Sequence, residues 1–161
     1  MKGIVLAQQG HIVNALPPVN GNGGVLLDRF KMTNHGHATI VLQIGVSGSA
    51  PTSIIVNECS AAAEPSPADK AAIPFNYFAE TANAGDTLGA KTPIAATGIT
   101  TVTANDNTMY VIELDASELS DGFEWVEVEV NIASGNSCLV SGVVILSGSR
   151  YAEDQNATAI V

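Results

Sequence analysis

Three histidines are the first residues in this chain that could do chemistry. His35 and His37 flank Gly36, and His11 lies closer to the N-terminus. A zinc site usually needs three or four ligands at workable spacing, and no thiol or carboxylate motif accompanies these rings. We therefore interpret the His35 segment as a turn that carries two polar rings, and we expect neither a metal nor a cofactor.

Two groups of oxygen-bearing side chains are further candidates. Asn105-Asp106-Asn107 could ligate calcium. However, it lacks the glycine and the distal glutamate of an EF-hand loop, and Asn and Asp are common turn formers. Glu124, Glu127 and Glu129 could supply the two carboxylates that a glycosidase uses. Because solvated strand faces with repeated glutamates are far commoner, we expect an acidic row that faces solvent or a partner.

A catalytic nucleophile and a sugar-binding platform are two more alternatives. Gly45-Val46-Ser47-Gly48-Ser49 falls one residue short of a nucleophile elbow, and no strand-to-helix turn accompanies it. Trp125, Tyr110 and Tyr77 could stack on a carbohydrate. With one Trp, three Tyr and four Phe in the chain, most aromatics are needed for the core. We expect that the chain is not an enzyme, and a carbohydrate- or receptor-binding module remains the alternative function.

Composition and charge narrow the class of protein. The 161 residues suffice for one domain, and the 46% of apolar residues are mostly Val, Ile, Ala and Leu, which is typical of β-sheet. Sixteen acidic residues against six basic ones give a net charge of -10. This balance excludes the basic patches that bind nucleic acid, and we expect no membrane partner. A basic protein surface would be attracted instead.

The sequence also carries no recognisable targeting segment. Gln8, Gln9 and His11 interrupt the apolar piece near the N-terminus, so we predict no signal peptide. No apolar run approaches the roughly 18 residues of a membrane-spanning helix. We expect synthesis in a cytoplasm, where Cys59 and Cys138 are buried thiols rather than a disulfide or a metal pair.

The clearest strand pattern runs from Trp125 to Ser147. Its first half alternates valines with Glu127 and Glu129, which is the period of a strand with one dry and one wet face. Ser134-Gly135-Asn136-Ser137 supplies a turn, and the following run, residues 138–146, is apolar at both parities. We predict a β-hairpin whose second strand is covered on both faces, inside a sandwich or an oligomer.

Similar β-branched runs recur along the chain, separated by turns rich in Gly, Pro, Asn and Ser. Residues 60–70 form a surface loop, and Asp115 with Glu118 forms the capping box of one helical turn. Together these patterns predict an all-β, antiparallel β-sandwich, jelly-roll-like, with extended N- and C-terminal arms. The remaining strands are predicted at residues 25–32, 37–46, 53–59, 73–80, 87–94, 98–103 and 109–114.

The domain organisation follows from these patterns. Residues 1–24 are an extended N-terminal arm, 25–149 the β-sandwich domain and 150–161 a C-terminal tail. The arm, in which two prolines forbid helix, lies along the domain's own sheet or reaches a neighbour. The apolar end of the tail fits burial against another subunit, although simple fraying is the alternative. The residues predicted to bind a partner are Pro17, Pro18, Arg150, Tyr151, Ile160 and Val161.

Five segments carry a likeness to a known family: HIVNALPP (11–18), NHGHATI (34–40), DTLGA (86–90), MYVIE (109–113) and ILSGSRY (145–151). Together they run over nearly the whole chain, which resembles a family of small tailed-bacteriophage head proteins. The resemblance implies a jelly-roll-like β fold and a structural role on the capsid surface of the virion, as a cement or decoration protein that bridges capsomers. It also implies synthesis in the host cytoplasm, a homo-oligomer (dimer or trimer) and the major capsid protein as partner.

Overall fold

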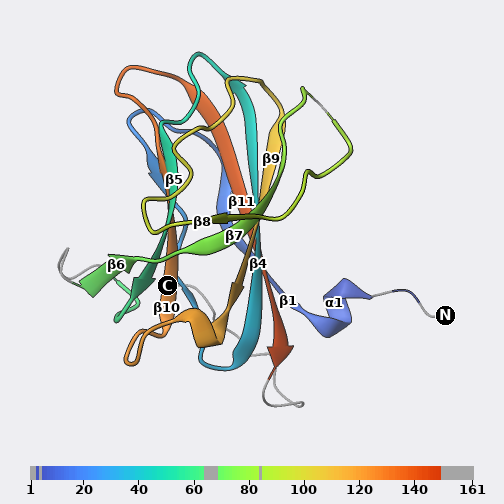
Figure 1. Cartoon of the computed structure of the whole chain (residues 1–161), viewed down its shortest axis with the longest axis vertical. Coiled ribbons are helices and arrows are strands. Elements are labelled where there is room, and N and C mark those ends of the chain that lie inside the picture. Colours follow the sequence, from blue (N-terminus) through green and yellow to red (C-terminus); the bar gives the residue numbers. More distant parts are fainter. Residues whose placement is uncertain (1–2, 4, 64–68, 84, 150–161) are drawn as a thin grey trace.

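The protein is a β-sandwich of two antiparallel sheets, as the sequence predicts (Figure 1). The computed structural model describes residues 3, 5–63, 69–83 and 85–149. The six-stranded sheet contains, in spatial order, β1 (His11–Asn20), β11 (Cys138–Ser149), β4 (His35–Ser47), β9 (Thr108–Asp115), β7 (Phe75–Glu80) and β8 (Thr92–Ile94). The five-stranded sheet contains β2 (Val25–Leu26), β10 (Trp125–Asn131), β5 (Ser53–Cys59) and β6 (Lys70–Ala72), while β3 (Phe30–Lys31) also pairs with β10.

Two short helical segments flank strands of the six-stranded sheet. One turn of α-helix, α1 (Leu6–Gln9), precedes β1, and a 3-10 turn, η2 (Ala116–Glu118), follows β9. The capping box at η2 is present as predicted, because the side chains of Asp115 and Glu118 each accept from the backbone of the other residue. Within the described residues, no helix is long and apolar enough to cross a membrane.

The core lies between the inner faces of the two sheets. Strand β4 contributes Ile40 and Leu42, and β10 contributes Val126 and Val128, all of them fully buried. Successive side chains of a strand point to opposite faces, so the period-2 pattern of the sequence becomes one dry face on each sheet. The aromatic residues Phe75 and Tyr110 fill the core beside them.

The predicted hairpin between residues 125 and 147 is wrong in its pairing. Strand β10 pairs with β5, β2 and β3 in one sheet, whereas β11 pairs with β1 and β4 in the other. The turn at residues 133–136 therefore carries the chain from one sheet to the other. Alternation of apolar residues specifies which face of a strand is buried, but it does not specify which strand is the neighbour.

The outer face of β11 is also not covered by the described residues. Its inward residues Val140 and Val144 are buried, but Leu139 and Val143 on the other face are 46% and 37% exposed. Both faces of β11 therefore carry apolar side chains, as predicted. The described chain has no layer that covers the second face. Coverage by another subunit stays a prediction.

Part of the predicted N-terminal arm lies along the domain's own sheet, the first of the two alternatives, but the prediction that the arm is extended is wrong at α1, which lies ahead of the two prolines. Residues 11–20 form β1, which runs antiparallel to β11 from His11 opposite Leu146 to Asn20 opposite Leu139. Pro17 and Pro18 are exposed in the second half of this edge strand. The predicted tail, residues 150–161, lies outside the described residues.

Two other strand predictions differ from the structure. The run at 25–32 is split into β2 and β3, because Leu27 and Asp28 donate backbone hydrogen bonds to different sheets, to Val128 and to Ala15. Of the segments 87–94 and 98–103, only Thr92–Ile94 forms a strand, and Ile99 makes an isolated bridge to Ile54. Short polar runs with glycine and proline lack the cross-strand contacts that stabilise a longer strand.

Candidate binding face

The outer face of the six-stranded sheet is largely open in the described chain, and we refer to it as the open face. Cross-strand pairing between β11, β4, β9 and β7 places its side chains in rows. Three full rows are Ser141, Gln43, Met109 and Glu80; then Val143, Val41, Val111 and Phe78; then Ile145, Thr39, Glu113 and Asn76. Each row therefore presents side chains from four neighbouring strands to the same side.

One half of the open face, over β1 and β11, is apolar. Ile12, Leu139 and Val143 are 48%, 46% and 37% exposed. Ile12 lies opposite Ile145 and Val143 lies opposite Val41, so these side chains extend the apolar surface across three strands. Exposed apolar residues gathered on one face make that face a candidate site of interaction.

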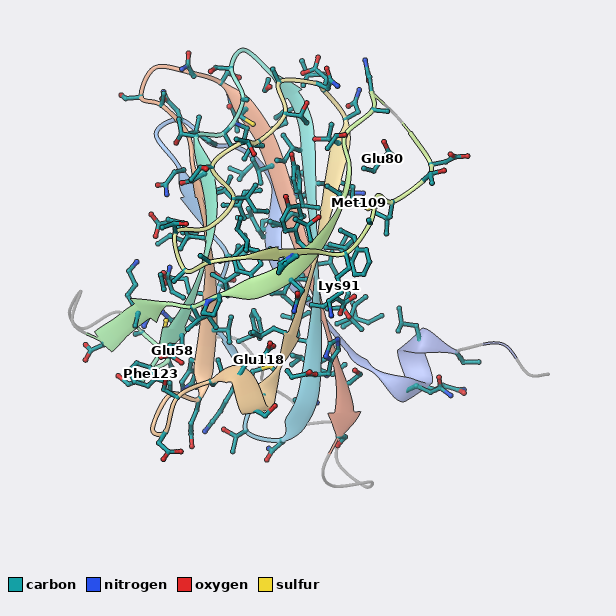
Figure 2. All side chains as sticks on the ribbon, viewed as in Figure 1. Glu58, Glu80, Lys91, Met109, Glu118 and Phe123 are labelled. Atoms are coloured by element: carbon teal, nitrogen blue, oxygen red, sulfur yellow. The ribbon has the colours of Figure 1, made fainter. Side chains whose placement is uncertain are left out.

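The other half of the open face, over β9 and β7, is acidic. Glu113 and Asp115 lie on β9 and Glu80 ends β7, while the six described strands of this sheet contain no lysine or arginine. Glu80 is 7% exposed, and its carboxylate accepts hydrogen bonds from the amides of Ala82 and Thr87. Figure 2 shows Glu80 near Met109, its neighbour in the same row.

A histidine sits between the two carboxylates of β9. The Nε2 atom of His37 lies 2.6 Å from Glu113 and its Nδ1 atom lies 2.7 Å from Asp115. Burial acts to lower the pKa of His37, but the hydrogen bonds to Asp115 and Glu113 outweigh it and raise the pKa above its ordinary value. Thr39 also donates to Glu113, so this cluster joins β4 to β9.

Ser147, His37 and Asp115 form a row that resembles a catalytic triad in residue types. A triad needs one ring nitrogen free to accept the proton of the serine hydroxyl. Here both nitrogens of His37 are bonded to carboxylates, so the ring has no free atom to act as a base toward Ser147. The arrangement therefore supports the strand pairing rather than nucleophilic catalysis.

The other two histidines stack on each other. The rings of His11 and His35 have centroids 6.2 Å apart and an interplanar angle of 22°. Burial lowers the pKa of His35, and the neighbouring His11 lowers it further. Within the described residues, no group of three or more His, Cys, Asp or Glu side chains is arranged to hold a metal ion.

A groove crosses the open face where β4 ends and β11 begins. Its volume is about 560 Å³. Its lining includes Pro18 on β1 and Gly85 in the loop after β7, with part of the first row, Ser141, Gln43 and Met109, between them. Of the sequence-predicted partner residues, Pro18 lines this groove, whereas Arg150, Tyr151, Ile160 and Val161 lie outside the described residues.

On the outer face of the five-stranded sheet, the charges are paired. The prediction that the acidic row faces solvent or a partner is wrong for Glu127. Glu127 is 3% exposed and lies 2.9 Å from Arg29 and 3.0 Å from Lys70. Arg29 also donates to the backbone carbonyls of Ala61 and Ala63, so the loop after β5 covers this site. A residue 98 positions away neutralises Glu127, which the local pattern around Trp125 could not reveal.

The remaining sequence candidates have structural roles. Asp106 accepts a hydrogen bond from the amide of Ser47 and so fixes the end of β4. Tyr110 is 2% exposed, and Trp125 is partly covered by Lys31, whose Nζ atom lies 5.6 Å from the ring centroid. Cys59 and Cys138 are both buried, as predicted.

Sequence reasoning did not predict that apolar residues of the open face are exposed. Their signal was present, because residues 138–146 are apolar at both parities. That pattern predicted a strand with two covered faces, and the structure shows which of its two faces is left open.

Comparisons with known proteins complete the description of the site. No family model matches the sequence, and none of the curated proteins matches it. Among solved structures, the crystal structure of the SPBc2 prophage-derived protein YomS is similar, with a TM-score of 0.44 and 16% sequence identity, over 84% of this chain and 92% of that chain. These comparisons assign no family to the chain.

Proposed function

We propose that this chain is a non-enzymatic structural protein of a tailed-phage particle, which binds the outside of the capsid and bridges neighbouring capsomers as a cement or decoration protein. The open face is the single observation that carries the proposal. Its apolar half, with Leu139 and Val143, and its acidic half, with Glu113 and Asp115, suit a partner surface that is apolar beside basic. The resemblance of five sequence segments to phage head proteins supplies the identity of that partner.

The structure favours binding through this face over strand addition at the edge of the sheet. Strand β1 is an edge strand, and Pro17 and Pro18 in it have no amide hydrogen to donate to an added strand. The opposite edge, β8, is three residues long and contains Pro93. Partner contacts made by side chains of the open face need no free edge.

The proposed mechanism is multivalent. A capsid presents many identical sites, so weak contacts of a dimer or trimer with adjacent capsomers add up to stable decoration. The net charge of -10 would favour encounter with basic patches on the shell. The tail, residues 150–161, would add an apolar contact through Ile160 and Val161.

Co-sedimentation with purified heads that lack this protein tests the proposal. We expect the full chain to bind the heads at saturable occupancy, and cryo-electron microscopy to place it outside the shell, on the capsomer borders. A variant without residues 152–161 keeps every described strand, so we expect it to fold and to lose head binding. Undiminished decoration by this variant would show that the tail has no part in binding.

Failure of the full chain to bind heads, together with its absence from mass spectra of purified virions, would disprove the structural role. Binding on a glycan array that is lost in Trp125→Ala would favour the alternative, a carbohydrate- or receptor-binding module. These results separate the two functions, because Trp125 lies on the five-stranded sheet and not on the open face.

A further inference from the structure

The groove on the open face has the dimensions of a short extended peptide. Its floor follows the row Ser141, Gln43, Met109 and Glu80 across four adjacent strands. With strands about 4.8 Å apart, the row spans roughly 14 Å, which is the length of about four extended residues. Gly45 lies beside this row and lets Leu139 pack close to β4, because a Cβ atom there would lie only 3.1 Å from the Cβ of Leu139.

The chemistry of the groove changes from one end to the other. Leu139 and Pro18 make the end near β1 apolar, whereas Gln43 and Ser141 in the middle offer an amide and a hydroxyl. At the far end, Glu80 is the one ionisable residue that lines the groove, and it is 7% exposed. Both oxygens of its carboxylate accept backbone amides, from Ala82 and Thr87, and among the described residues no lysine or arginine pairs with it.

This lining selects among classes of ligand. None of the lining residues is aromatic, so the groove lacks the platform on which sugars stack. The carboxylate of Glu80 repels anions and attracts a cation. Backbone groups of an extended peptide could bond to the side chains of Gln43 and Ser141, which resembles other modes of peptide recognition.

We propose that the groove binds an extended segment of a partner protein, with an apolar side chain against Leu139 and a lysine or arginine side chain directed to Glu80. Residues i and i+2 of an extended chain point to the same side and lie about 7 Å apart, and the long basic side chain covers the remaining distance. The inference goes beyond the proposed function, because any partner with such a segment would fit. On a phage head, the capsid protein would supply it.

Nuclear magnetic resonance titration of the ¹⁵N-labelled full chain tests this inference. The probe is the blocked peptide acetyl-Gly-Leu-Ser-Lys-Gly-amide, compared with two peptides in which glutamine or glutamate replaces lysine. We expect saturable shifts of the amides of Gln43, Gly45 and Met109, and an affinity at least about fivefold higher for the lysine peptide than for the glutamine peptide, as for one partly shielded ion pair. Equal affinity for the lysine and glutamate peptides would overturn the role of Glu80.

A first variant separates the charge of Glu80 from its role in holding the neighbouring loop. In Glu80→Gln we expect the preference for lysine over glutamine to disappear, whatever the affinity of the glutamine peptide becomes, because the new side chain keeps only one of the two oxygens that bond to Ala82 and Thr87. If both peptides weaken by the same factor, Glu80 only shapes the loop that its bonds to Ala82 and Thr87 hold, and the charge assignment is wrong.

Ser141→Phe fills the middle of the groove, and Ser147→Phe is its matched control on the same face of β11, outside the groove. We expect the first variant to abolish the shifts and the second to leave them unchanged. No saturable shift with any peptide on the full chain would overturn the proposal. Binding that appears only after residues 150–161 are removed would also overturn it, since the tail would then be the occupant. Head co-sedimentation of Ser141→Phe tests the proposed function separately.

Discussion

The two outer faces of this sandwich differ in how their charged and apolar side chains are covered. On the five-stranded sheet, Arg29 and Lys70 neutralise Glu127, and the loop after β5 covers the pair. On the six-stranded sheet, Val143 and Leu139 remain exposed, and Glu80 has no basic partner among the described residues. The buried charges of the first face are paired within the described chain, whereas the second has both apolar surface and negative charge that a partner could cover.

This difference separates residues that stabilise the fold from residues that are available for binding. A buried charge must be paired, because an unpaired one costs several kcal/mol, so the cluster around Arg29 serves stability. Exposed apolar residues contribute little to folding, and the free energy of the system falls when another surface covers them. Substitutions on the two faces should therefore change different measurements.

The largest effect on stability is expected from Arg29→Met. This change leaves Glu127 buried with only Lys70 beside it and removes the donor to Ala61 and Ala63, so we expect the free energy of unfolding to fall by about 3 kcal/mol. Urea denaturation followed by circular dichroism measures it.

Lys31→Met is the matched control, because Lys31 pairs with Glu124 in an exposed position on the same sheet. Solvent screens that pair, and its loss should leave the urea midpoint nearly unchanged. Equal destabilisation by Arg29→Met and Lys31→Met would show that burial of the ion pair has no special role.

The largest effect on binding is expected from Val143→Glu. It places a charge in the apolar half of the open face, and we expect affinity for heads to fall by about 100-fold, as for a residue that dominates an interface. Val143 is 37% exposed, so folding should be unaffected. Co-sedimentation at several protein concentrations gives the affinity.

Leu26→Glu provides the control on the other face. Leu26 is 44% exposed on β2 of the five-stranded sheet, so the same chemical change occurs at similar exposure. We expect less than about a twofold change in head binding, within the range of a residue outside an interface. Equal losses for both variants would mean that the open face does not determine binding.

The sequence predicted the fold class and most strands because their cause is local. Alternation of β-branched residues specifies a strand and its dry face, and β4, β5, β9 and β10 lie within two residues of their predicted positions or extend beyond them. The capping box at Asp115 was predictable for the same reason, since both partners lie within one turn.

What the sequence could not provide depends on contacts between distant segments. The pairing of β10 with β5 rather than β11 follows from how the whole chain packs, and alternation is the same for either neighbour. The burial of Glu127 depends on Arg29 in another part of the chain. To predict the open face, one needs both the local pattern and the contacts between distant segments. The sequence shows that residues on both sides of β11 are apolar, but it does not show that one side has no covering layer in the described chain.

The smallest expected effect concerns the cluster in which His37 pairs with two carboxylates of the open face. His37 has a raised pKa between Glu113 and Asp115, so the folded state binds its proton more tightly than the unfolded state does. The stabilisation is complete below the ordinary pKa of 6.5 and is lost as pH rises through the raised value.

We expect His37→Gln to lower the free energy of unfolding at pH 5.5 by at most about 1 kcal/mol, because the ring is one-third exposed and solvent screens the pairs. The difference should shrink as pH rises past the folded pKa of His37. His35, whose pKa is lowered, destabilises the fold on acidification, but it is present in both proteins and cancels in the comparison. A difference that stays constant from pH 5.5 to pH 9 would mean that His37 is not charged in this cluster. The open face would then be more acidic than the proposed binding mode assumes, and its affinity for a basic partner would not depend on this ring.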